Sequence, residues 1–397
     1  MKSILQNYQK NKILYVFTLS LFALIVFLET INHRFEMSDF KVYYLAGKAF
    51  FNNQEIYGVQ FGLASGYYKY SPVFLLIFSP YLIFGYKTAC IIHAFILAIA
   101  TILTLISAKE IYQKLINQRE LQNRYLFIFA IFIIVNHLFR EIHLGNLNMI
   151  IVMLLCLGIQ QILNEKRILP GFFIALAILI KPYLIILAIP LLFHKKFGFL
   201  MSLGAWLGIL LIAPITFLGL DKFIIINKHW IHEIFQHGAY LYSNHTFTSL
   251  IRQYVTEALN DHSHLYFLIA FTLAYVLIYF ALLKKYSAIS EKNNNKSLVF
   301  SYFILLSLIP NILITDTEHF LYSTPIILFS IYSLYSNLNT KYIIAFVIFS
   351  ILYAINSPDI LGKFLSAKFE DLGILGMANL GLIVTFILLQ RNQKTNE

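Results

Sequence analysis

Charged residues are scarce in this 397-residue sequence, at 12% of the chain against about a quarter in a soluble domain. Hydrophobic residues make up 59%. A soluble core of this chain length could not hide so much apolar surface from water, so the soluble class is excluded. A lipid bilayer can accommodate it, because a run of about 20 apolar residues spans the hydrocarbon core. Many runs in the sequence approach that length.

Cysteine is also rare, and the familiar nucleotide motifs are missing. The two cysteines, Cys90 and Cys156, lie inside apolar runs, where neither is placed for a disulfide or a metal site. The sequence has no Walker motif, no GxGxxG and no GxSxG, which excludes binding of a soluble nucleotide by a known fingerprint. It also has no internal repeat, no low-complexity tract and no heptad run.

The positive charge of the chain is informative about topology. The formal net charge is +11, and lysine and arginine recur in short breaks between apolar runs, at about 109–124, 166–167, 195–196, 284–296, 341 and 391–394. Most acids lie in the alternate breaks. The apolar stretch at about 13–28 is too long for a signal sequence, so we expect a retained first transmembrane helix. The positive-inside rule then places both termini in the cytoplasm.

Two apolar runs are predicted to be broken. The run 168–194 lies between two basic breaks and must cross an even number of times, yet it is too short for two full crossings. Lys181-Pro182 divides it, so we expect short helices at 168–180 and 183–194. The same reasoning makes 125–163 two short helices joined at 140–148. Short helices of this kind leave a cavity open to the outer face, the setting in which irregular backbone is tolerated at membrane depth.

The predicted architecture is an all-α, polytopic membrane protein with a single domain over residues 1–397. We expect about 12 transmembrane or half-spanning helices and two long outer-face segments, at about 32–87 and 221–264. The stretch 72–84 is apolar but short, and is typical of a juxtamembrane helix. Aromatic and small residues near positions 40–47 have helical spacing and predict an amphipathic helix on the membrane surface.

Asp39 is the leading catalytic candidate, because it follows the first helix closely and would lie at the mouth of the outer cavity. A carboxylate at that point can act as general base for an acceptor hydroxyl. The alternative is structural, since Ser38 or Asp39 just before a helix is ordinary N-capping.

Other polar residues are predicted to gather on the same side of the membrane. They lie at the outer tips of the two short hairpins and at the end of a later helix: Arg140, Glu141, His143, Asn146, Asn148, Lys181, Asp316, Glu318 and His319. Charges that deep in an apolar chain are expensive and usually functional. A lysine and an arginine beside a lipid-exposed cavity suit a phosphate-bearing ligand. The alternative for Arg140 and Lys181 is snorkelling to the headgroups.

Histidines are frequent in the second outer segment, at His229, His232, His237, His245, His262 and His264. The spacing of His229 and His232 would allow a metal site on a helix. No carboxylate–histidine pattern of known metal spacing accompanies them, so an interfacial helix bearing histidines is the favoured interpretation. Asn244-His245-Thr246 matches a glycosylation sequon, a pattern that arises often by chance.

The order of these motifs resembles glycosyltransferase family 87, whose members are polytopic enzymes of the GT-C type. The matching residues run along most of the chain: Asp39-Phe40 with Tyr43, Tyr44, Ala46 and Gly47; Tyr57; Tyr70 and Pro72; Gly145-Asn146-x-Asn148; Gly171; Lys181-Pro182; Asn244, Thr246, Leu250 and Arg252; Pro310; and Asp316 to His319. The sequence departs from the family pattern in two places. Asn146 stands where the family commonly has glutamine, and the Asp316–His319 cluster stands where an aromatic residue is common.

The resemblance implies a function and a set of site residues. The enzyme would move a hexose, expected to be mannose, from a polyprenyl-phosphate sugar to a lipid or glycan acceptor at the outer face of the bacterial inner membrane. Asp39 would be the catalytic base, with His319 as a second catalytic group. Lys181 would contact the donor phosphate, helped by Arg140, and the remaining substrate-binding candidates are Asn146, Asn148, Tyr44, Tyr70 and Asp316. We expect no cofactor and no nucleic-acid partner. We also expect no metal, since a lipid phosphate is already a good leaving group.

Two other functions are compatible with a polytopic chain. A polysaccharide polymerase or ligase would rely on arginines and a histidine in a late outer loop, where this chain offers Arg252. A lipid-linked-sugar transporter would favour inverted repeats and charge pairs near the bilayer midplane. A cavity lined jointly by Asp39, Lys181 and His319 would favour the transferase.

Overall fold

The computed structural model describes residues 2–62, 66–116, 125–237, 245–246, 273–274, 277, 279, 294–312, 316–336 and 338–392. Every regular element in these ranges is a helix, so the predicted all-α fold is confirmed. Five of the described helices are long and apolar enough to cross a membrane, or up to seven if two bent helix pairs each count as one span. Four shorter apolar helices accompany them. The chain is therefore a multi-pass membrane protein.

The chain divides into two compact units, which are described separately. Unit 1 comprises residues 1–107 and 139–241, and unit 2 comprises residues 108–138 and 242–397. Two helices have residues in both units, α4 (Tyr86–Ile116) and α5 (Leu126–Leu144). The single domain expected over residues 1–397 stays a prediction.

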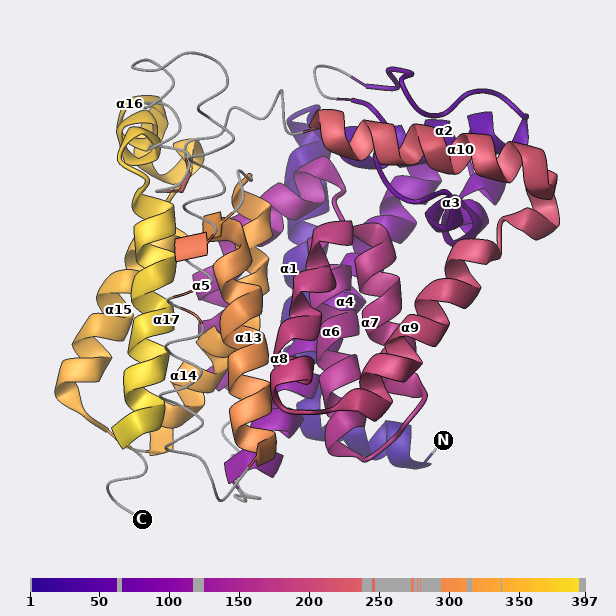
Figure 1. Cartoon of the computed structure of the whole chain (residues 1–397). Helices are drawn as coiled ribbons and strands as arrows, with labels where there is room; N and C mark the ends of the chain where they lie inside the picture. The colour runs from indigo at the N-terminus through magenta and orange to yellow at the C-terminus, as the bar shows by residue number, and fades with distance from the viewer. Residues whose placement is uncertain are drawn as a thin grey trace. The chain divides into compact units, whose positions relative to one another are not determined.

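Unit 1 contains the joints of both broken apolar runs that the sequence predicts. Its helices include α1 (Lys2–Ile31), α6 (Asn148–Leu163), α7 (Leu169–Ile180), the 3₁₀ helix η2 (Pro182–Leu187), α8 (Ala188–Phe193) and α9 (Phe197–Ile212). Helices α6, α7 and α9 pack side by side (Figure 1). The break at Lys181-Pro182 is confirmed. The other joint is shorter than expected, because α5 continues to Leu144 and is long enough to span.

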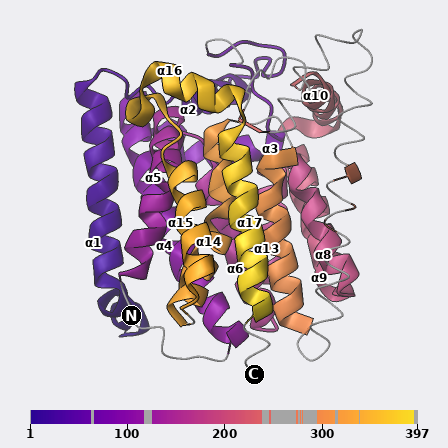
Figure 2. The same cartoon turned by 90° about the vertical axis from the view of Figure 1, so that its left-hand side faces the viewer.

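A layer of helices gathers at one end of unit 1 (Figures 1 and 2). It consists of α2 (Ser38–Phe51), α3 (Pro72–Phe78), the 3₁₀ helix η1 (Ser79–Ile83) and the second part of α10 (Ile215–His237). Helix α9 and the segment Ile215–Ile234 of α10 meet at 87°, and α10 is itself kinked at Gly219, whose φ is +71°. The indole of Trp230 donates a hydrogen bond to the Lys69 carbonyl at 3.2 Å. The helices that the sequence predicted near 40–47 and at 72–84 are confirmed, and their location at the membrane surface stays a prediction.

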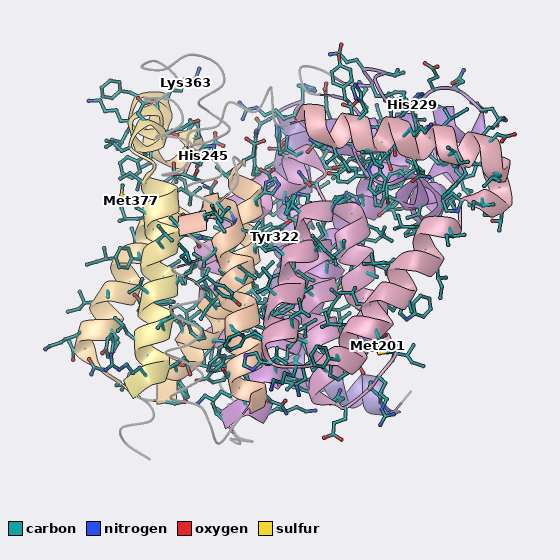
Figure 3. All side chains as sticks on the ribbon, in the orientation of Figure 1. Met201, His229, His245, Tyr322, Lys363 and Met377 are labelled. Atoms are coloured by element: carbon teal, nitrogen blue, oxygen red, sulfur yellow. The ribbon has the colours of Figure 1, made fainter. Side chains whose placement is uncertain are left out.

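Large apolar side chains point outward from the helices of unit 1. On α9, Met201 is 76% exposed (Figure 3), and Phe217 at the start of α10 is 71% exposed. Exposed apolar surface of this kind would be costly in water. It is the surface that a bilayer covers.

Unit 2 is a helical bundle with a buried polar group in its core. Its described helices are α13 (Asn294–Ile312), η4 (Thr317–Ser323), α14 (Thr324–Ser336), α15 (Thr340–Ala354), α16 (Pro358–Asp371) and α17 (Ile374–Asn392). Helices α15 and α16 meet at 94°, so α16 lies across the end of the unit (Figure 2). The Asn379 amide donates to the Ser307 carbonyl and accepts from the Ser323 hydroxyl. The predicted roles of Asn244, Leu250 and Arg252 fall outside the described residues.

Candidate active site

Helix α2 carries Asp39 at the end of unit 1 where α2, α3, η1 and the second part of α10 form a layer. The chain enters α2 through Met37, which has a left-handed backbone with φ of +47° and is fully buried. The aromatic face of α2, including Phe40 and Tyr43, is also buried, and this packing fixes the orientation of the helix. Asp39 is the second residue of α2 and lies in its first turn. The N-cap residue is Met37, which makes no side-chain cap bond. The partly exposed carboxylate of Asp39 is therefore not the N-cap of α2.

A tight turn between α5 and α6 brings Asn146 to Asp39. Gly145 has φ of +66°, a left-handed backbone that favours glycine. A Cβ at position 145 would lie 2.6 Å from the Cβ of Phe40 and 2.9 Å from that of Met37, so the turn can approach α2 this closely with glycine alone. The amide of Asn146 then donates to the Asp39 carboxylate, with 2.9 Å between Nδ2 and Oδ2.

The orientation of the Asn146 amide is set by its own turn. The backbone N–H of Leu147 donates to Asn146 Oδ1 at 2.8 Å. Because that oxygen accepts from the backbone, the NH₂ group is the end that faces Asp39. The turn therefore orients the Asp39 carboxylate.

A buried charge network lies beside this pair. Glu141 accepts from the backbone N–H of Met149 and from the Asn148 amide, both at 2.9 Å. Asn148 Oδ1 accepts from Lys181 Nζ at 2.6 Å. A carboxylate can only accept and an ammonium can only donate, so the Asn148 amide is aligned between opposite charges. Glu141 is fully buried, and Lys181 is 6% exposed, so the Asn148 amide joins two buried charged side chains.

The Lys181-Pro182 step explains how a lysine reaches this network from the middle of an apolar run. Pro182 has no N–H and disfavours helical backbone at the residue before it. Accordingly, α7 ends at Ile180 and Lys181 is extended, with φ of −130° and ψ of 97°. The chain resumes as the 3₁₀ helix η2 before α8 begins, so the predicted second short helix is in two parts. This break turns the Lys181 side chain toward Asn148.

Two tyrosines of the site are linked by their hydroxyl groups. Tyr43 and Tyr70 lie 2.8 Å apart, oxygen to oxygen, and both are buried. Burial raises the pKa of Tyr70 well above its ordinary value of 10.0, and the charge of Asp39 raises it further. The hydrogen bond with Tyr43 acts in the opposite direction and lowers the pKa of Tyr70. The hydroxyl pair ties α2, which carries Asp39, to the segment that precedes α3.

Two other predicted site residues of unit 1 lie apart from this group. The Tyr44 hydroxyl donates to the Phe84 carbonyl at 2.7 Å, and Lys48 lies over its ring. Tyr44 thus anchors the end of η1, and its role in substrate binding stays a prediction. Arg140 is exposed on α5, outside the buried network. Near it, His143 pairs with Glu29 of α1 at 2.7 Å.

Asp316 and His319 lie in unit 2, at the start of η4. Asp316 is the N-cap residue of η4, without a side-chain cap bond. His319 Nδ1 lies 3.3 Å from the carboxylate of Glu318, which is almost fully buried. Their predicted roles in catalysis and substrate binding stay predictions.

Histidines on α10 give no metal centre in the described part of the chain. His229 and His232 are exposed on that helix (Figure 3). Among the described residues, no group of three or more His, Cys, Asp or Glu side chains could hold a metal ion.

Sequence reasoning missed His93, which lies under the site. It is fully buried in α4, its Nε2 is 3.2 Å from the Asn146 carbonyl oxygen, and its ring stacks on Phe40. A lone histidine in an apolar helix carries no signal that separates it from a core residue.

Comparison with known proteins assigns the family. The model of glycosyltransferase family 87 matches residues 68–309, which is more than half of the chain. The matched region contains Asn146, Asn148 and Lys181, whereas Asp39 precedes it. No curated protein matches the sequence. The extent of the family match and the apolar spans together show that the chain belongs to glycosyltransferase family 87 and is a membrane glycosyltransferase.

Proposed function

We propose that this protein transfers a hexose, expected to be mannose, from a polyprenyl-phosphate sugar to a lipid or glycan acceptor, with Asp39 as general base. The observation that carries the proposal is the Asp39–Asn146 pair. It combines a partly exposed carboxylate with a fixed amide donor at 2.9 Å. A general base needs a defined orientation and access to the proton that it removes. Asp39 meets both requirements.

The reaction needs one base and one site for the leaving group. Asp39 would take the proton of the acceptor hydroxyl as the oxygen attacks the anomeric carbon. The bond between that carbon and the phosphate oxygen breaks, and polyprenyl phosphate leaves with the electron pair, with inversion at the carbon. Lys181 is the cation that would balance the departing charge. The turn that places Asn146 on Asp39 continues into Asn148, which accepts from Lys181 Nζ, and this supports placing both groups around one reaction centre.

The arrangement of unit 1 supports an outer-face location for the site. Helix α6 begins at Asn148 in the site and runs away from it, and α7 returns to Lys181. The turn between them, which holds Lys166 and Arg167, therefore lies at the opposite end from Asp39. Basic loops mark the cytoplasmic side, so the site would face the periplasm or the exterior of a bacterial inner membrane, with both termini in the cytoplasm.

Membership of a glycosyltransferase family favours the transferase over the two alternatives named above. A transporter would bind the same lipid-linked sugar and release it unchanged. A polymerase or ligase would move a whole glycan rather than one hexose. Product analysis separates these outcomes directly.

The test uses a strain in which the gene for this protein is deleted, and it measures the lipid-linked glycans of that strain. We expect mass spectrometry to show a glycan one hexose shorter than in the parent strain. The wild-type gene should restore the missing hexose. Purified full-length protein in liposomes should then add one hexose to a membrane extract of the deletion strain when polyprenyl-phosphate mannose is supplied. Transfer that requires a nucleotide sugar, or transfer of a whole glycan, would contradict the proposal.

A further inference from the structure

His93 makes three contacts at the base of the site. Its Nε2 lies 3.2 Å from the carbonyl oxygen of Asn146, and its Nδ1 lies 3.0 Å from the Tyr81 hydroxyl. Its ring stacks on Phe40, the residue after Asp39, with 4.6 Å between ring centroids. Because His93 is fully buried, each of these contacts is shielded from solvent.

The chemistry of the partners assigns the proton on the ring. A carbonyl oxygen can only accept, so Nε2 carries the hydrogen and donates to Asn146. Nδ1 is then the acceptor in the neutral ring, and the Tyr81 hydroxyl donates to it. Both ring nitrogens are matched to partners on different elements, η1 and the turn between α5 and α6. A residue that merely filled space would not need either match.

The Asn146 backbone is held on both sides by these contacts. Its N–H donates to the Glu141 carbonyl at 3.1 Å, and its carbonyl accepts from His93. Its side-chain oxygen is held by the Leu147 N–H. The remaining group of Asn146, the NH₂, is the one that meets Asp39. The ring that holds the Asn146 backbone also packs on Phe40, so it contacts Asn146 and the residue that follows Asp39 in α2.

We propose that His93 is a positioning residue for the transfer reaction. It sets the distance between the Asn146 amide and the Asp39 carboxylate by holding the Asn146 carbonyl through Nε2 and Phe40 through its ring face. His93 acts through these neighbours and does not touch substrate. The inference rests on the proposed role of Asp39 as base. A small misplacement of a catalytic group can cost about a hundredfold in rate, which gives the position its importance.

Two amide substitutions test the roles of the two ring nitrogens of His93 separately. In His93→Gln, the amide nitrogen can reach the place of Nε2 and keep the bond to Asn146. In His93→Asn, the shorter side chain can reach the place of Nδ1 and keep Tyr81, but it loses Asn146. Tyr81→Phe removes the hydroxyl that orients the ring and leaves the imidazole in place. His229→Asn, at an exposed histidine of α10, is the matched control.

Apparent kcat and donor KM are measured with polyprenyl-phosphate mannose in liposomes. His93→Asn should lower kcat by about tenfold to a hundredfold, in the range expected for a misplaced catalytic group, with donor KM unchanged. His93→Gln should restore most of the rate, and Tyr81→Phe should lower kcat in the same direction. In an Asn146→Ala background, His93→Asn should cause no further loss. Equal rates for the Gln and Asn variants, or additive losses in the double variant, would overturn the inference.

Amide hydrogen exchange tests the same positioning role of His93 without an activity assay. The peptide that covers residues 141–149 should exchange faster in His93→Asn than in wild type, and at the wild-type rate in His93→Gln. Unchanged exchange in both variants would overturn the inference even if the donor were wrong. Conversely, full activity of Asp39→Asn with the exchange pattern intact would contradict the proposed base and leave the positioning of Asn146 standing.

Discussion

The side-chain amide of Asn146 donates a hydrogen bond to the carboxylate of Asp39, with 2.9 Å between Nδ2 and Oδ2. Asp39 lies in α2, whereas Asn146 lies in the turn between α5 and α6. The close approach at Gly145 brings this turn against α2. Asn146 and its preceding glycine therefore act together on the orientation of Asp39.

Asn146→Leu keeps the volume of the side chain and removes the donor. A hydrogen bond to a charged group contributes about 1.5–3 kcal/mol, so we expect a rate loss of about tenfold to a hundredfold. The transfer rate of the purified variant in the liposome assay measures this. A rate equal to that of wild type would contradict it.

Gly145→Ala should both destabilise the protein and lower its activity. The left-handed backbone costs an alanine about 1–2 kcal/mol, and the added methyl group would also press on Phe40 and Met37. Thermal unfolding in detergent and the transfer rate are the measurements. Gly204→Ala on α9, where a Cβ meets open space, is the control and should not be destabilised. Equal behaviour of the two variants would refute the close-approach argument.

The sequence predicted the parts of the site where a charged or helix-breaking residue interrupts an apolar stretch. Lys181-Pro182 interrupts such a run, and the helix break appears where it was expected. The carboxylate of Asp39, soon after the first apolar helix, is a second example. In contrast, the joint at 140–148 was predicted too wide, because nothing in the sequence shows that α5 tolerates Arg140 and Glu141 near its end. Arg140 is exposed there, whereas Glu141 caps the start of α6.

Glu141→Leu should unfold the site more than it alters the chemistry. It would leave the Asn148 amide and the Met149 N–H without the carboxylate that accepts from them, and a buried donor left unsatisfied costs about 1–3 kcal/mol. We expect a large drop in the thermal unfolding temperature, with Glu141→Gln less affected because it can keep one acceptor. Glu55→Gln, at an exposed residue, is the control. A stability of Glu141→Leu equal to that of the control would contradict the network.

Lys181→Ala should weaken donor binding. The ammonium is the cation proposed to meet the donor phosphate, so its loss should raise the donor KM by at least about tenfold, the factor that 1.4 kcal/mol represents. A titration with polyprenyl-phosphate mannose measures the change. Lys166→Ala, at the exposed far end of the α6–α7 hairpin, should leave the donor KM unchanged. An unchanged KM in Lys181→Ala would refute the phosphate contact.

Partners across the fold account for what the sequence could not predict. His93 and Glu141 are each explained by groups that come close only after folding, the Asn146 carbonyl and the Asn148 amide. The Tyr44 hydroxyl likewise donates to the Phe84 carbonyl, a partner that the family-like motif does not reveal, and its contact with substrate stays a prediction. Residue type and spacing identify charges that are expensive in a membrane. They do not identify the neutral groups that hold those charges in place.

Asp39→Asn is the most direct test of the central claim that Asp39 is the base. The variant should fold and insert normally, because asparagine can keep a hydrogen bond to Asn146 but cannot take a proton. With polyprenyl-phosphate mannose as donor, we predict a rate loss of about 10²–10⁴-fold, the usual contribution of a general base, while the exposed control Asp221→Asn stays at the wild-type rate. Transfer by Asp39→Asn at a rate close to wild type would contradict the account.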